Sequence, residues 1–138
     1  MGLVSSDGVL GSVSVVSGDV KDLMSRYRAK FHDMDRVYCG IFDMLTSCLS
    51  CVFESGVSVD LKHQSVMQSE FYIVGLRSRL LSELSSLNCA ISGTSHSGLH
   101  VLFSERRDVV LQYLSRLGDL RGDIDVIQRT RYADSWRR

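Results

Sequence analysis

Apolar residues recur at alternating steps of four and three along the first half of the chain, from Val20 to Val52. This spacing places their side chains on one stripe of an α-helix, because 3.6 residues complete each helical turn. Further apolar residues widen the stripe toward its C-terminal end, so one neighbouring helix is too few to cover it. The pattern predicts a long first helix over about residues 19–54. We call its stripe the first-helix seam; its positions are Val20, Met24, Tyr27, Phe31, Met34, Tyr38, Ile41, Leu45, Cys48 and Val52.

Helical periodicity returns twice after this segment. Residues 54–58 read as a turn, and Asp60 is the expected N-cap of a second helix over about residues 60–90. The Gly- and Ser-rich segment 92–98 reads as a loop, and a third helix is expected over about residues 98–130. The chain contains no proline that would interrupt these helices. Short connections between long helices predict an all-α fold, an antiparallel three-helix bundle forming one domain over residues 19–138.

Residues 1–18 differ from the rest because glycine, serine and valine dominate them, which predicts a flexible N-terminal arm. The start Met1-Gly2, with Ser6 four residues later, fits the N-myristoylation pattern and makes Gly2 a candidate lipidation site. Peripheral membrane association is expected only if Gly2 is acylated. The chain shows no signal-peptide pattern and no run of about 18 uncharged apolar residues. We therefore expect an intracellular, cytoplasmic protein without a transmembrane helix.

Composition adds two constraints. The sixteen Lys and Arg residues balance the sixteen Asp and Glu residues, so net charge does not draw the whole chain to nucleic acid or membrane. Alanine, the strongest helix former, occurs only three times, so the helices must depend on burial of their apolar faces. Low alanine with abundant serine, valine and arginine suits a small viral or pathogen protein.

The chain carries no recognisable catalytic or cofactor motif. The Gly-x-Ser-x-Gly elbow and the glycine-rich phosphate loops are both missing from the sequence. His96 and His100 have metal-ligand spacing, but His96 falls in the expected loop and no third ligand is evident. We expect all four cysteines to be reduced thiols. Cys48 and Cys51 lie deep inside a predicted helix, so we expect core cysteines there and not a redox or zinc site. We expect no enzyme activity, no cofactor and no bound metal.

Three long helices form a slender rod, and the seam with its flanking residues exceeds what such a rod can cover internally. We therefore expect another chain to cover part of the seam, with self-association the expected mode. The expected function is non-enzymatic protein–protein interaction or self-assembly, in an adaptor, assembly or chaperone-like role. The seam residues expected to make these contacts are Phe31, Tyr38, Ile41 and Leu45.

Arginine supports an alternative function. Thirteen arginines stand against three lysines, and many of them fall in the third helix and the C-terminal tail. Tyr132 and Trp136 interleave with the tail arginines, and such combinations hold phosphates and stack bases. The alternative is an oligomeric RNA-binding protein. Its candidate contacts are Arg106, Arg107, Arg116, Arg121, Arg129, Arg131, Arg137 and Arg138.

Overall fold

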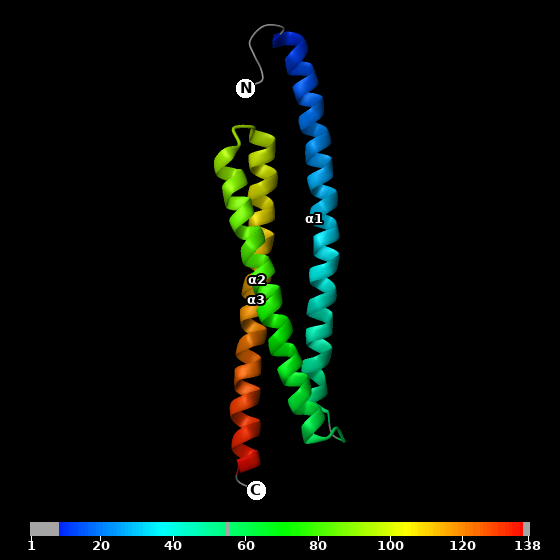
Figure 1. The fold of residues 1–138 in the computed structure, drawn as a ribbon, viewed down its shortest axis with the longest axis vertical. Coiled ribbons are helices and arrows are strands. Elements are labelled where there is room, and N and C mark those ends of the chain that lie inside the picture. Colours follow the sequence, from blue (N-terminus) through cyan, green and yellow to red (C-terminus); the bar gives the residue numbers. More distant parts are fainter. Residues whose placement is uncertain (1–8, 55, 137–138) are drawn as a thin grey trace.

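The computed structural model contains three long helices packed along one another (Figure 1): α1 (Val9–Phe53), α2 (Val59–Gly93) and α3 (Ser97–Trp136). The structure describes the backbone of residues 9–54 and 56–136, and the side chains of residues 19–54 and 56–129. Within these ranges the chain forms no strand, and successive helices run in opposite directions. The predicted all-α, antiparallel three-helix bundle is confirmed.

The first helix is longer than predicted, because α1 begins at Val9 and not near residue 19. Val9, Val13 and Val16 precede Val20 at steps of four, three and four, so apolar residues continue at helical spacing toward the N-terminus, which the glycine and serine content obscured. The predicted boundary between arm and helix is therefore wrong, and residues 1–8 of the predicted arm lie outside the described residues. Figure 1 shows the N-terminal turns of α1 projecting beyond the loop that joins α2 to α3.

The core is a continuous strip of apolar side chains along the inner sides of the three helices. Its α1 positions keep the four-three spacing of the seam, and α2 and α3 show the same spacing. The core therefore consists of residues that the periodicity of the sequence places on one side of each helix. Its buried members on α1 are Tyr38, Phe42, Leu45, Leu49 and Val52; those on α2 are Val66, Ile73, Leu76, Leu80 and Leu87; those on α3 are Leu99, Phe103, Val110, Leu117, Ile124 and Ile127.

Polar side chains and one glycine define the helix ends. The Ser58 hydroxyl accepts a hydrogen bond of 3.2 Å from the Leu61 amide, so Ser58 caps α2. The predicted cap, Asp60, lies instead in the first turn of α2, where its carboxylate complements the helix dipole. Gly56 adopts a φ of 88°, which glycine allows in the turn between α1 and α2. At the start of α3, Nδ1 of His96 accepts a hydrogen bond from the Leu99 amide.

Candidate functional site

A buried arginine joins the three helices. Arg106 of α3 is only 4% exposed, and its Nε donates a 2.7 Å hydrogen bond to Oε2 of Glu83 on α2. Its Nη1 donates to Oδ1 of Asp35 on α1 at 2.5 Å, and its Nη2 donates to Oε1 of Glu83 at 3.3 Å. One guanidinium therefore bridges two carboxylates from two other helices, the planar geometry for which arginine is suited.

Two tyrosines complete the hydrogen bonding of these carboxylates. The Tyr38 hydroxyl donates to Oε1 of Glu83 at 2.8 Å, and the Tyr113 hydroxyl donates to Oδ1 of Asp35 at 2.7 Å. The guanidinium carbon of Arg106 also lies 5.0 Å from the centre of the Phe31 ring. Among the described residues, no buried side-chain nitrogen or oxygen lacks a hydrogen-bond partner. The cluster is thus fully satisfied, which is the condition under which buried charges are tolerated.

Burial and neighbouring charges shift the pKa values within this cluster. Burial, reinforced by the hydrogen bond to Glu83, raises the pKa of Tyr38 from 10.0 to about 12. Burial and the hydrogen bond to Asp35 likewise raise the pKa of Tyr113. Burial alone lowers the pKa of Arg106, but the hydrogen bonds and charges of Glu83 and Asp35 outweigh it and raise that pKa overall. The arginine stays charged and both tyrosines stay neutral at physiological pH.

Sequence reasoning missed this cluster, although a signal for it exists. Glu83 lies three residues after buried Leu80 and four before buried Leu87, so it occupies a core position of α2. Arg106 occupies the same kind of position on α3, between Phe103 and Val110. Opposite charges at core positions of two antiparallel helices, at similar distances from their connecting loop, predict an interhelical ion pair. The hydroxyl of the seam residue Tyr38 donates to Glu83 of the same chain, and its contact with a partner chain stays a prediction.

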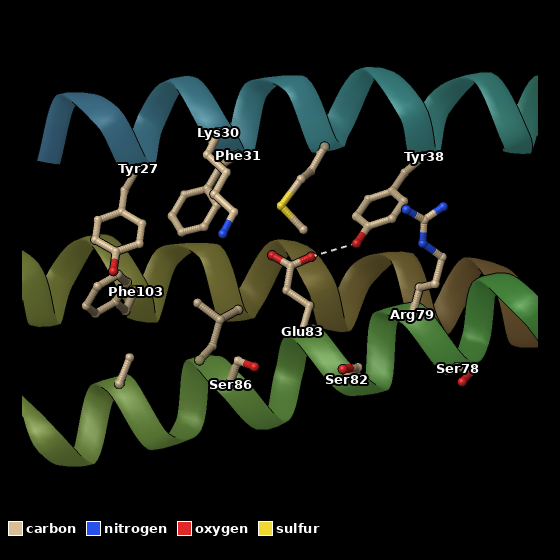
Figure 2. Close-up of a pocket in the computed structure, with 13 residues that line it drawn as sticks. Tyr27, Lys30, Phe31, Tyr38, Ser78, Arg79, Ser82, Glu83, Ser86 and Phe103 are labelled. Carbon is tan, nitrogen blue, oxygen red and sulfur yellow. Dashed lines mark hydrogen bonds between the residues drawn. The ribbon is translucent and has the colours of Figure 1, made fainter. Parts of the chain in front are cut away.

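A groove of about 580 Å³ opens between α1 and α2 beside this cluster. Figure 2 shows α1 and α2 on either side of the groove, with α3 behind them. Phe31 projects into the groove from α1 and Phe103 contributes a second apolar ring from α3, and the hydrogen bond between Tyr38 and Glu83 crosses the groove. The remaining lining residues are Tyr27, Lys30, Met34, Ser78, Arg79, Ser82, Ser86, Leu87 and Ala90.

The charged side chains that line the groove are either exposed at its sides or held in the buried cluster. Lys30 of α1 and Arg79 of α2 are exposed at its two sides, and neither forms an ion pair with a described carboxylate. Glu83 already accepts hydrogen bonds from Arg106 and Tyr38, so it is engaged in the fold. The serines of α2 contribute small side chains along one side, which leaves room for an inserted apolar group.

The residues predicted as a partner-binding seam mainly face the core of the same chain. Tyr38 and Leu45 are buried, and Phe31 and Ile41 are half-buried against the same core. This follows from the width of the stripe, since α2 and α3 together cover most of it. Phe31 keeps a second role because it also lines the groove.

The predicted nucleic-acid contacts fall into separate groups. Arg106 is buried in its ion pairs, so it is closed to a phosphate in this arrangement. Arg107 is half-buried, whereas Arg121 and Arg129 are exposed. Arg116 is exposed as well, and its guanidinium carbon lies 4.3 Å from the centre of the Phe42 ring. Gly2 and the side chains of Arg131, Arg137 and Arg138 lie outside the described residues.

Cysteine and histidine side chains do not form a metal site within the described part of the chain. All four cysteines are free; Cys48 and Cys51 are half-buried, whereas Cys39 and Cys89 are exposed. His96 and His100 are both exposed, and His96 serves as a hydrogen-bond acceptor at the start of α3.

Apolar side chains also remain uncovered on the side of α2 that faces away from the core. Phe71 is 77% exposed, and Met67, Val74 and Leu81 are exposed as well. These residues follow a four-three spacing that Ser78 and Ser85 complete, so all six share one side of the helix. We call this surface the outer face of α2; its members are Met67, Phe71, Val74, Ser78, Leu81 and Ser85.

The segment Asp19–Phe53 of α1 is long and apolar enough to span a membrane, judged by length and composition only. The expectation that the chain has no transmembrane helix rested on the absence of about 18 consecutive uncharged apolar residues, and α1 contains no such run. Only 28% of its most apolar window is buried in the bundle. Mostly buried core helices and signal sequences near the N-terminus pass the same test, so length and composition alone do not assign α1 to a membrane.

Comparisons of the chain with protein-family models, with curated proteins and with solved structures each give no match.

Proposed function

We propose that the chain is a non-enzymatic interaction protein that assembles through helix packing, with self-association as its primary mode. The observation that carries this proposal is the outer face of α2. The opposite side of α2 already packs in the core of the bundle. Contiguous apolar side chains that stay exposed on such a helix are typical of contact surfaces. Its aromatic member, Phe71, is the most exposed large hydrophobic residue among the described side chains.

The charge distribution along α2 supports the same proposal. No acidic or basic residue falls on the outer face, although α2 carries four along the same stretch. Glu70 accepts a hydrogen bond from Gln128 of α3, and Arg77 lines a groove between α2 and α3. Arg79 and Glu83 line the groove beside α1. A helix face kept in water usually carries charged residues, so their confinement to the other sides favours burial of this face.

This proposal moves the contact surface away from the first-helix seam. Tyr38 and Leu45 are buried within the chain, so a partner reaches them only if the bundle opens. Replacing Phe71 and Val74 together by serine tests the proposal, since both side chains are exposed and the fold does not depend on them. We expect the variant to keep its helical dichroism and to lose self-association, measured as molar mass by light scattering. If the variant keeps the molar mass of the unmodified chain, and this mass exceeds that of the monomer, the outer face of α2 is not the contact surface.

RNA binding remains the second candidate function, and fewer arginines support it than the sequence predicts. Arg116, Arg121 and Arg129 of α3 are exposed and form no ion pair with a described carboxylate. Exposed arginines of this kind are available to phosphates. Asp119, Asp123 and Asp125 are exposed on the same helix and reduce the local positive field, which makes this the weaker proposal.

A further inference from the structure

We propose that a second copy of this chain packs antiparallel against the outer face of α2, with Phe71 of each copy lying over Ser78 and Ser82 of the other. This inference rests on the proposed function and specifies its partner and geometry. Ser78 and Ser82 also line the groove between α1 and α2. The contact therefore places an aromatic side chain of one copy at the edge of the groove of the other.

The order of side-chain sizes along the outer face favours the antiparallel orientation. Its N-terminal half carries Met67, Phe71 and Val74, whereas its C-terminal half carries Ser78, Leu81 and Ser85. In a parallel pair each residue meets its own copy, so large side chains meet large ones and two serines meet at the other end. In an antiparallel pair centred near Leu76, Met67 lies opposite Ser85, and Val74 lies opposite Ser78. Large side chains then meet small ones, which is how helix surfaces interdigitate.

The same register brings Phe71 of one copy level with Leu81 and Ser82 of the other. Ser82 is exposed, and its short side chain leaves space above the helix. The groove that this serine lines also contains the apolar rings of Phe31 and Phe103. Gly75, near the centre of the contact, has no atom within 4 Å of the position its Cβ would take, so the two helices can approach closely there.

The twofold arrangement needs no charged partner, and the outer face is smaller than the contact surface of a stable complex. Both copies present the same uncharged face, as an isologous contact requires. The outer face runs from Met67 to Ser85, so its 19 residues are about 28 Å long and about 10 Å wide, and each copy offers roughly 280 Å² of projected surface. Stable complexes bury about 800 Å² on each partner. The outer face of α2 therefore supplies about a third of that area, so the remainder must come from flanking surfaces and the association is expected to be weak.

Disulfide trapping tests the geometry. In the full chain with Cys39, Cys48, Cys51 and Cys89 replaced by serine, one variant carries Phe71→Cys and a second carries Ser82→Cys. We expect a mixture of the two to form a disulfide-linked dimer on mild oxidation, and either variant alone to form at least tenfold less. In the antiparallel register, identical positions lie more than about 15 Å apart along the axis, beyond the roughly 7 Å that a disulfide spans. A matched control pairs Phe71→Cys with Gln112→Cys, which is exposed on α3 and should not cross-link.

Three results would overturn this inference in distinguishable ways. Efficient cross-linking of Phe71→Cys with itself would assign a parallel pair, and would leave self-association intact. A cysteine-free chain that is monomeric by light scattering would remove both the inference and the proposed self-association. A monomer that sediments with phosphatidylcholine vesicles would assign the outer face to a lipid surface. As a second variant, Ser82→Arg should weaken association at least tenfold without changing helical dichroism, and unchanged association would contradict the proposed position of Phe71.

Discussion

Arg106 of α3 and Glu83 of α2 each occupy a core position of their helix, and two hydrogen bonds of 2.7 and 3.3 Å join them. The apolar neighbours of these residues can pack in several registers, whereas this hydrogen-bonded pair forms in one. Sliding α2 past α3 by one helical turn would separate the two groups by about 5.4 Å and leave the buried Glu83 carboxylate without its cation. We therefore expect the pair to favour one register of the antiparallel α2–α3 hairpin.

Removing the arginine should destabilise the protein strongly. Arg106→Ala leaves Glu83, whose side chain is 8% exposed, without its cation, so we expect the free energy of unfolding to fall by about 3–5 kcal/mol. Urea denaturation followed by dichroism measures this change. Arg107→Ala is the matched control, because Arg107 forms no ion pair with a described residue, and it should change stability by about 0.5 kcal/mol or less. Equal effects of the two substitutions would contradict the assigned role of Arg106.

The two carboxylates should differ in their importance. Glu83→Gln weakens a largely buried ion pair and should lower the free energy of unfolding by about 1–3 kcal/mol, because a hydrogen-bonded charge in a buried site is lost. The side chain of Asp35 is 37% exposed, so water screens its interaction with Arg106, and Asp35→Asn should cost less than about 1 kcal/mol. Urea denaturation of both variants checks the order. A larger loss for Asp35→Asn would show that the α1 contact dominates the cluster.

Alkaline titration should reveal Tyr38. Since its folded pKa is raised from 10.0 to about 12, the neutral hydroxyl stabilises the fold fully below pH 10, and this contribution is lost as the pH rises from 10 to about 12. Ultraviolet absorbance of the phenolate should therefore show a late-ionising component, which Tyr38→Phe removes in part. Tyr113, whose pKa is also raised, supplies the remainder. Complete ionisation of all tyrosines near pH 10 in a chain that is still helical would contradict the structure.

A seam residue and an outer-face residue should behave in opposite ways. Leu45 is fully buried, so Leu45→Ala should lower the free energy of unfolding by about 2–5 kcal/mol. Phe71→Ser should change stability little at a concentration where the chain is monomeric, and should abolish self-association at high concentration. Thermal denaturation and light scattering on the same samples separate the two effects. Loss of association in Leu45→Ala while the variant remains fully folded would restore the seam as the contact surface.

The salt dependence of RNA affinity tests nucleic-acid binding independently of stability and self-association. If α3 binds RNA, affinity should fall steeply between about 50 and 200 mM salt, and replacing Arg121 and Arg129 by glutamate should abolish it. Arg106→Leu should leave the affinity of the folded fraction unchanged, because Arg106 is buried. Fluorescence anisotropy with a single-stranded RNA measures both. An absence of binding at about 50 mM salt would eliminate this second candidate.

The sequence was sufficient to predict the fold because every core helix face repeats at four-three spacing. Leu45 and Val52 lie at such positions and are buried, as the periodicity predicts. The same periodicity continues through Val13 and Val16, where glycine and serine content led to the wrong prediction of an arm. Local composition was a poor guide there, because α1 begins at Val9 in spite of the glycine and serine content.

The candidate site was harder to predict, because periodicity shows which residues are apolar but not which neighbour covers them. Tyr38 was expected to contact another chain, yet its hydroxyl reaches Glu83, which is distant in sequence. Arg106 was grouped with the exposed arginines because charge is the usual mark of a solvent-facing position, and its core spacing was overlooked. Phe71 belongs to the apolar set of α2 in the sequence, and only the three-dimensional arrangement shows that nothing in the chain covers it.

The most direct test of the central claim is a sedimentation dilution series on the unmodified chain. We predict a mass near 15.4 kDa at about 1 µM that rises toward twice this value at about 100 µM. A mass that stays at 15.4 kDa across the whole range would contradict self-association through the outer face of α2.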